Sequence, residues 1–379
     1  MRHVVVVGAG VFGVWAAHHL RASGARVTLV DAYGPASPRA SSGDQSRILR
    51  CGYGGDEIYT RFARRSLEQW LSAARLPSER PIWYPCGVLW LAAAGDPYTA
   101  ATRRTLEREE YPLDVIDADG LRARYPHLLA ADLPDALLEP DGGVLMARRA
   151  VRALAAALVR AGSPLIRGRI LTPAPGPIRS LRLADDREIA GDAFLFACGA
   201  WLPSVFPELL AGKIRPTRQT VVYFGTPAGD DRFSCAHTPA WIDFPAGIYG
   251  VPEIEAGGVK VGIDEHGPPI DPDNDDRIPD AAAIVKAREW LGRRFPDLSA
   301  APVVGTRVCQ YENTSTGDFL IDRHPDHDNV WIVGGGSGHG FKHGPAVGEH
   351  VANLVLTGAE TNPRFALAGK SVQAQRAVF

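Results

Sequence analysis

Three glycines near the N-terminus are spaced as in loops that bind a dinucleotide cofactor. Gly8, Gly10 and Gly13 form the pattern GxGxxG after a run of valines. The first glycine allows a tight turn, the second lets the backbone approach a pyrophosphate, and the third lets a helix pack closely on a strand. Asp31 ends a second strand-like segment, where its carboxylate can accept hydrogen bonds from ribose hydroxyls. Because an acid here disfavours a 2′-phosphate, the spacing predicts NAD or FAD rather than NADP.

The surrounding segments predict the elements that hold this loop. Residues 4–7 are typical of a strand buried on both faces, residues 14–23 of a helix and residues 26–31 of a second strand. Two more buried strands are predicted at 192–197 and 330–333, each followed by a loop that contains glycine. Residues 83–91 predict a further strand, and residues 165–190 predict a β-meander. Loops at the carboxyl ends of parallel strands line one crevice, so this arrangement suits an extended cofactor such as FAD better than NAD.

The positions of these strands predict how the chain is divided. Cofactor-binding strands lie near the start, the middle and the end, with other material between them. The expected fold class is therefore α/β combined with α+β: a Rossmann-like FAD/NAD(P)-binding domain with an inserted antiparallel-sheet substrate domain. We assign residues 1–82, 142–213 and 318–379 to the FAD-binding domain, and residues 83–141 and 214–317 to the substrate domain. The stretch from about residue 358 has weak periodicity, which predicts loose attachment.

Composition narrows the class of protein. The net charge of −2 over 379 residues provides no basic excess for nucleic acid or an anionic membrane. The five cysteines are widely spaced and odd in number, which predicts neither a disulfide framework nor a metal site and favours the reducing cytoplasm. A secretory signal peptide over residues 2–17 is the alternative. Of 41 basic residues only five are lysines: Lys213, Lys260, Lys286, Lys342 and Lys370.

Several further stretches make the chain resemble the monomeric sarcosine oxidase family, a branch of the D-amino-acid-oxidase-like flavoproteins. The resemblance covers nearly the whole chain. Beyond the glycine loop it rests on SSGDQSRILR at 41–50, CGAW at 198–201, KVG at 260–262, CQY at 309–311 and SGHGFK at 337–342. It implies a monomeric, cytoplasmic FAD enzyme that oxidises the carbon–nitrogen bond of a small secondary amino acid to an imine and reduces O2 to H2O2.

The resemblance also implies roles for individual residues. Cys309 corresponds to the cysteine that forms a thioether with the flavin 8α-methyl group. Arg50 and Lys342 correspond to two cations that hold the substrate carboxylate, one as a planar fork and the other as a point charge. Arg47 corresponds to an arginine that packs on the flavin ring. Lys260 corresponds to the lysine that promotes the reaction with O2, because a fixed positive charge stabilises developing superoxide.

The remaining implied residues line the pocket or hold the cofactor. Tyr249 and Tyr311 resemble pocket-lining tyrosines, and no metal ligand is expected. No general base is required, because a neutral secondary amine already carries the lone pair that expels hydride. The implied cofactor-binding set is Gly8, Gly10, Val11, Phe12, Gly13, Asp31, Ser41, Ser42, Arg47, Cys198, Gly199, Trp201, Cys309, Gly336, Gly338, His339, Gly340, Phe341 and Lys342.

Two positions depart from the family pattern. Members that act on sarcosine or N-methyltryptophan have Tyr-His where this chain has Ile263-Asp264, and Gly43 replaces a histidine. Asp264 either attracts a cationic group of the substrate, and is then a candidate catalytic residue, or caps a turn. These differences predict a bulkier or more polar N-alkyl or cyclic amino acid rather than sarcosine. Three alternatives stay open here: a flavin dehydrogenase with another electron acceptor, a flavoprotein subunit of a larger complex, and an NAD-dependent dehydrogenase.

Overall fold

A six-stranded sheet carries the N-terminal glycine loop near its centre. The computed structural model describes residues 1–174, 176 and 178–373. The strand order is β18-β19-β12-β1-β2-β9, and every pairing is parallel except that of β18 with β19. Its strands are β1 (His3–Val7), β2 (Arg26–Asp31), β9 (Leu165–Arg167), β12 (Ala193–Phe196), β18 (Leu320–Arg323) and β19 (Val330–Gly334). The central strands β12 and β19 are buried throughout, which explains their uninterrupted apolar sequences.

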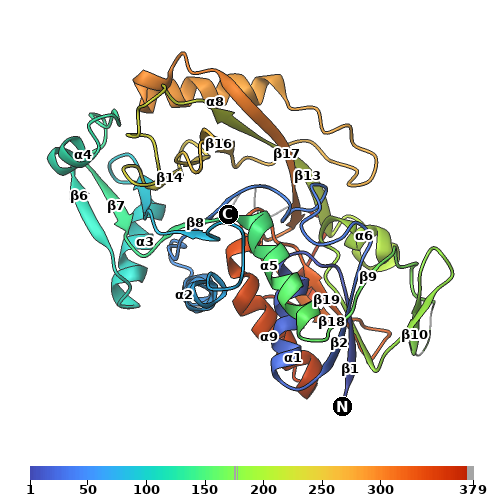
Figure 1. The fold of residues 1–379 in the computed structure, drawn as a ribbon. Helices are drawn as coiled ribbons and strands as arrows, with labels where there is room; N and C mark the ends of the chain where they lie inside the picture. Colours follow the sequence, from blue (N-terminus) through green and yellow to red (C-terminus); the bar gives the residue numbers. More distant parts are fainter. Residues whose placement is uncertain (175, 177, 374–379) are drawn as a thin grey trace.

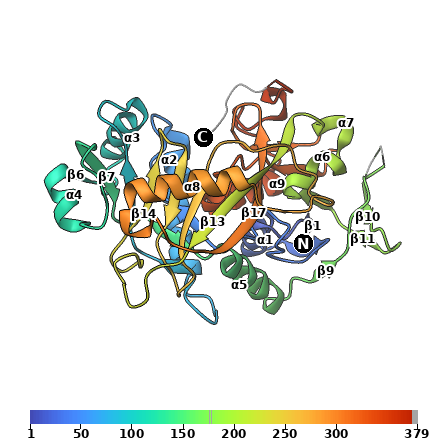
Figure 2. The same ribbon diagram turned by 90° about the horizontal axis from the view of Figure 1, so that it is seen from above.

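Helices cover this sheet. They are α1 (Val11–Ala22), α2 (Glu57–Ala73), α5 (Ala147–Arg160) and α9 (Gly344–Thr357). In both ribbon views α1 lies between α5 and α9 (Figures 1 and 2). The contact of α1 with α9 is close because position 348 is glycine: a Cβ there would lie 2.6 Å from the carbonyl carbon of Trp15. The helices therefore bring the first and last parts of the chain together.

A second, eight-stranded sheet has the order β17-β13-β16-β15-β14-β5-β7-β6. Its strands are β5 (Val88–Leu91), β6 (Asp114–Asp117), β7 (Asp135–Glu139), β13 (Ile214–Phe224), β14 (Ala240–Asp243), β15 (Ile248–Val251), β16 (Val259–Ile263) and β17 (Val303–Thr314). All pairings are antiparallel except that of β14 with β5. Helix α8 (Ala281–Arg294) lies across one face (Figures 1 and 2) and buries Trp290 and Leu291 against the sheet.

Smaller elements connect the two sheets or lie at the periphery. A three-stranded sheet, β3-β8-β4, joins the two parts. Its strands are β3 (Arg47–Leu49), β8 (Gly143–Leu145) and β4 (Trp83–Tyr84), and a separate hairpin is formed by β10 (Ser180–Arg182) and β11 (Glu188–Ala190). The short helices are α3 (Pro97–Arg108), α4 (Ala118–Arg124), α6 (Leu202–Val205), α7 (Pro207–Leu210), η1 (Gly199–Trp201), η2 (Pro296–Leu298), η3 (Gly340–His343) and η4 (Leu367–Gly369).

The predicted fold class is confirmed: a Rossmann-like sheet is combined with an inserted, mainly antiparallel sheet. All six strands of the first sheet fall in the ranges assigned to the FAD-binding domain, and all eight of the second in those of the substrate domain. The exact domain limits stay a prediction, since β4 pairs with β8 across one of them. Within the described residues, no helix is long and apolar enough to span a bilayer.

Three local predictions were wrong. The expected strand over 83–91 is split into β4 and β5, which belong to different sheets because Pro85 and the positive φ of Gly87 interrupt it. The expected β-meander over 165–190 is β9, which joins the large sheet, followed by one hairpin. The segment after 358 is firmly attached as far as residue 373: Arg364 pairs with Asp56 and Asp318, polar anchors that apolar periodicity does not reveal.

Candidate active site

The glycine loop fits tightly between β1 and α1. Gly8 has φ +104°, and a Cβ there would lie 2.3 Å from the carbonyl oxygen of Ala197. A Cβ on Gly13 would lie 1.8 Å from the carbonyl oxygen of Gly8, so helix and strand pack too closely for any other residue. Helix α1 has no acidic residue in its first turn and no side chain capping its N-terminus. Its N-terminal amides and dipole therefore favour an anion.

Three adjoining cavities run from this loop into the molecule. The outer cavity, about 320 Å³, extends from Asp31 to Glu312. The connecting cavity shares Val11, Phe12, Ser41, Ser42 and Glu312 with it and reaches Arg47 and Tyr311. The inner cavity shares Arg47 and Tyr311 with the connecting one and ends at Arg50 and Lys342. This elongated space has the form that an extended dinucleotide with a reactive ring at one end requires.

The structure brings nearly all predicted site residues to these cavities. The outer cavity is lined by Gly8, Gly10, Val11, Phe12, Asp31, Ser41, Ser42, Cys198, Gly199 and Trp201. The connecting cavity adds Arg47, Tyr311, Gly336, Gly338, Gly340 and Phe341. The inner cavity adds Arg50, Tyr249, Asp264, Cys309, His339 and Lys342. Gly13 and Lys260 line none of the three: Gly13 packs against the carbonyl of Gly8, and Lys260 bonds to Asp44 and to the Ser46 carbonyl.

Asp31 already holds backbone groups. One carboxylate oxygen accepts from the amide of Ala9 at 2.7 Å, and the other from the amides of Tyr33 at 2.8 Å and Gly34 at 2.6 Å. Asp31 therefore ties the glycine loop to the loop after β2. A carboxylate has about four acceptor positions, so three amide donors leave capacity for a ribose hydroxyl.

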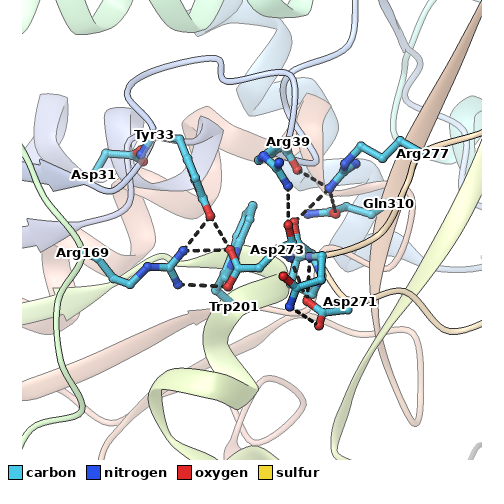
Figure 3. A network of polar contacts seen from close by, with 11 residues as sticks. Asp31, Tyr33, Arg39, Arg169, Trp201, Asp271, Asp273, Arg277 and Gln310 are labelled. Carbon is cyan, nitrogen blue, oxygen red and sulfur yellow. Dashed lines mark hydrogen bonds and ion pairs between the residues drawn. The ribbon is translucent and has the colours of Figure 1, made fainter. Parts of the chain in front are cut away.

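A polar network around Asp273 holds three residues that line the outer cavity (Figure 3). Asp273, in the loop between β16 and α8, accepts hydrogen bonds from Tyr33, from Arg169 at 2.8 and 3.0 Å and from the indole of Trp201 at 2.9 Å. Tyr33, Arg169 and Trp201 line the outer cavity. Burial would raise the pKa of Asp273, but these donors lower it to about 2. The loop thus fixes three wall residues from three different elements.

Two cations lie at the inner end. The Arg50 guanidinium lies 4.4 Å from the ring centroid of Tyr53 and 4.9 Å from that of Trp90, and it donates to the carbonyl of Gly52. The Lys342 ammonium donates to the Tyr53 hydroxyl at 2.6 Å. Burial and the charge of Arg50 hold the pKa of Lys342 well below its usual value. The negative charge of a bound carboxylate would oppose both effects and raise the pKa of Lys342.

A carboxylate in the same cavity faces these cations. The Tyr311 hydroxyl donates to Asp264 Oδ1 at 2.7 Å. The Asp264 side chain lines the inner cavity, the position that a role toward the substrate requires. Burial raises the pKa of Asp264, and the Tyr311 hydrogen bond with the charges of Arg50 and Lys342 opposes that rise. The cavity therefore combines two cationic groups with one acidic group.

A buried charge cluster lies behind the cavity wall. Arg47 Nη2 is 3.0 Å from Cys309 Sγ, and Arg47 Nη1 is 2.5 Å from Asp44 Oδ2. Lys260 Nζ is 2.6 Å from the same Asp44 oxygen and 3.0 Å from the Ser46 carbonyl. Burial raises the pKa of Asp44, but Lys260 and Arg47 outweigh it and hold that pKa well below its usual range. Two cations and one carboxylate give the cluster a net charge of +1.

Sequence reasoning missed three residues of this region. Asp44 stood inside the quoted stretch 41–50, and Glu312 directly follows Tyr311, so each carried a weak positional signal. Asp273 carried none, because nothing in its acidic loop indicates that it reaches Tyr33, Arg169 and Trp201.

The fold and the cavities define a dinucleotide-dependent enzyme whose reaction site is a cavity lined by groups of both charges. Residues 3–354 match the family described as FAD dependent oxidoreductase (DAO), and the chain belongs to that family. It is an FAD-dependent oxidoreductase.

Comparisons of sequence and of structure find similar proteins of known name. The chain is 30% identical to the monomeric sarcosine oxidase of Bacillus sp. (strain B-0618) over 363 residues, covering 94% of this chain and 92% of that protein. It is 27% identical to the N-methyl-L-tryptophan oxidase of Escherichia coli O139:H28 over 368 residues, covering 93% and 94%. A modified fructosyl peptide oxidase from Aspergillus nidulans superposes with a TM-score of 0.84 at 20% identity, covering 100% and 96% of the two chains.

Proposed function

We propose that this chain is an FAD-dependent oxidase of the carbon–nitrogen bond of a secondary amino acid, N-alkylated or cyclic, and that sarcosine is not its main substrate. The observation that carries the proposal is the inner cavity, where Arg50 and Lys342 face Asp264 at the end of a dinucleotide cleft. Bound FAD supplies the hydride acceptor and transfers the electrons to O2. Five free cysteines in the described chain fit a reducing compartment, and we place the enzyme in the cytoplasm as a monomer.

The residues present fit this cofactor and substrate. The glycine loop and the N-terminus of α1 would hold the pyrophosphate, and Asp31 the ribose. Arg50 and Lys342 would bind the substrate carboxylate, which fixes the position of the α-carbon. Their positive charges also favour the neutral form of the substrate amine, the form that releases hydride. Asp264, held by Tyr311, is positioned to accept a hydrogen bond from the amine or from a cationic substituent.

A substrate panel tests the proposal. Sarcosine, larger N-alkyl amino acids and cyclic amino acids are compared by peroxide-coupled steady-state kinetics. We expect kcat/KM to be highest for a compound larger or more polar than sarcosine, because Asp264 adds a carboxylate to the inner cavity. The sequence-based expectation that Gly43 widens this pocket is wrong, since Gly43 lines none of the three cavities and a Cβ there would lie 1.8 Å from the carbonyl oxygen of Ser37. Sarcosine as the best substrate would contradict the substrate class. Anaerobic bleaching of the flavin without H2O2 formation in air would instead indicate a dehydrogenase.

We further propose that Cys309 forms a thioether with the flavin. Its sulfur lines the inner cavity, and the guanidinium of Arg47 at 3.0 Å stabilises negative charge that develops on it. After acid precipitation we expect the yellow colour of the native protein in the pellet, and that of Cys309→Ala in the supernatant. Cys86 lies outside the three cavities, so the Cys86→Ala protein should keep its yellow colour in the pellet as the native protein does. Free flavin from the native protein would refute the linkage.

A further inference from the structure

Glu312 is a buried carboxyl group between the outer and connecting cavities, and the proposed function does not use it. It follows Tyr311 on β17, is 8% exposed and lines both cavities. Among the described residues, its Oε2 atom has no hydrogen-bond partner. A buried polar atom without a partner destabilises the fold, so a group supplied by a ligand is the expected complement.

Three glycines leave room around this carboxyl group. A Cβ on Gly336 would lie 3.2 Å from Glu312 Oε1, and Cβ atoms on Gly199 and Gly334 would lie 3.4 and 3.5 Å from Oε2. The backbone of two loops therefore approaches the carboxyl group, while one side faces the cleft. Glu312 is thus held in place by main chain, and its free oxygen is available to a ligand.

The position of Glu312 along the cleft indicates which part of FAD lies beside its carboxyl group. Asp31 lies at one end and Arg47, with the inner cavity, at the other. The middle of FAD consists of a pyrophosphate and a polyol chain. A carboxyl group accepts hydrogen bonds from hydroxyls in both of its protonation states, whereas its ionised form repels phosphate. We propose that Glu312 is a further cofactor-binding residue, whose carboxyl group binds hydroxyls of the ribityl chain of FAD. This inference rests on the assignment of FAD to the cleft.

The protonation of Glu312 predicts a pH dependence of FAD binding that tests the same assignment. Burial raises the pKa of Glu312 to about 7, partly opposed by the amides of Gly335 and Gly336. Six other titratable groups line the same two cavities. They are the Cys198 thiol and the Tyr33 and Tyr311 hydroxyls, whose pKa values burial also raises, Asp31 at the outer end, and the guanidinium groups of Arg169 and Arg47.

Bound pyrophosphate adds negative charge nearby and raises the pKa of Glu312 further. Binding then takes up a proton, so FAD affinity is highest below pH 7 and falls as pH rises above it. For each unit by which bound FAD raises the pKa of Glu312, the FAD affinity at high pH should be about tenfold lower than the affinity below pH 7.

Reversible FAD binding tests the assignment. The Cys309→Ala protein is stripped of flavin, and the Kd for added FAD is measured between pH 6 and 9 by quenching of flavin fluorescence. In that background, Glu312→Ala should weaken FAD binding by about 10–100-fold at pH 6.5, because hydrogen bonds to the ribityl chain are lost. Glu312→Gln keeps the hydrogen-bonding shape, so it should retain most of the affinity and lose the pH dependence. Glu253→Gln, whose carboxylate bonds Thr226 away from the cleft, is the matched control.

ADP, which has the pyrophosphate but no ribityl chain, separates the two possible contacts. At pH 6.5, where Glu312 is mostly protonated, ADP affinity should be nearly the same with and without Glu312→Ala. An equal loss for ADP and FAD at that pH would overturn the ribityl assignment. Unchanged FAD affinity in both Glu312 variants would also overturn it. Failure of the Cys309→Ala protein itself to bind FAD would contradict the assignment of the cleft rather than the role of Glu312. Circular dichroism and the Tm identify a variant that fails to fold. If Glu312→Ala fails, the pH dependence of FAD binding in the conservative Glu312→Gln variant decides the question.

Discussion

Replacing Lys260 with methionine should slow the reaction of the reduced enzyme with O2 by about 10²–10³-fold and leave reduction by substrate largely unchanged. The ammonium is not on a cavity wall; it is 1% exposed and bonded to Asp44 behind Arg47. Its removal changes the net charge of the Asp44–Arg47–Lys260 cluster from +1 to zero. In a dry interior such a change acts over several ångströms, so the developing negative charge on O2 loses stabilisation.

Stopped-flow absorbance separates the two half-reactions. Reduction is followed anaerobically with substrate, and reoxidation by mixing the reduced enzyme with O2. Lys370→Met is a matched control, because Lys370 is also buried, at 4% exposed, but donates to the Arg364 carbonyl outside the three cavities. Equal reoxidation rates in the native and Lys260→Met proteins would show that this cluster does not promote the oxygen reaction. A matching loss in Lys370→Met would point to general destabilisation.

Replacing Arg50 with methionine should lower the affinity for carboxylate ligands by about 30-fold or more. Arg50 is 7% exposed, and removing one partner of a buried, hydrogen-bonded charge pair costs about 2–5 kcal/mol. Lys342 does not compensate, because an ammonium is a point charge and cannot replace the two parallel hydrogen bonds of a guanidinium. Arg50 also stabilises the charge of the buried Glu139 carboxylate. That carboxylate keeps hydrogen bonds from the amides of Cys51 and Gly52 and from the indole of Trp90 when Arg50 is removed, so we expect the local fold to persist.

The measurement is a flavin absorbance titration with a small aliphatic carboxylate and with its uncharged amide. Only the carboxylate should lose affinity in Arg50→Met, and Arg288→Met on α8 should bind both ligands as the native protein does. Unchanged carboxylate binding in Arg50→Met, with normal flavin content, would remove Arg50 from the substrate site. An equal loss for the carboxylate and the amide would show a change in pocket shape rather than a lost ion pair.

Local sequence determined the cofactor half of this protein. Gly8, Gly13 and the valine run of β1 specify a strand, a turn and a helix through backbone sterics and burial, which depend on near neighbours in the chain. The resemblance then placed Arg50, Cys309 and Lys342 in one site, although they are far apart in sequence. The same reasoning overextended the strand over 83–91, because pairing partners decide where a strand ends.

The tertiary structure alone decided which charges meet. Lys260 and Asp44 are 216 residues apart, and Tyr33 and Asp273 are 240 apart, yet each pair forms a hydrogen bond. Such contacts depend on strand register and on the path of loops between the two sheets, which no local pattern encodes. The same holds for Asp264, whose side chain faces Tyr311 because β16 and β17 both flank β13. Sequence therefore determined the class of cofactor and fold, whereas long-range packing determined the electrostatics of the reaction site.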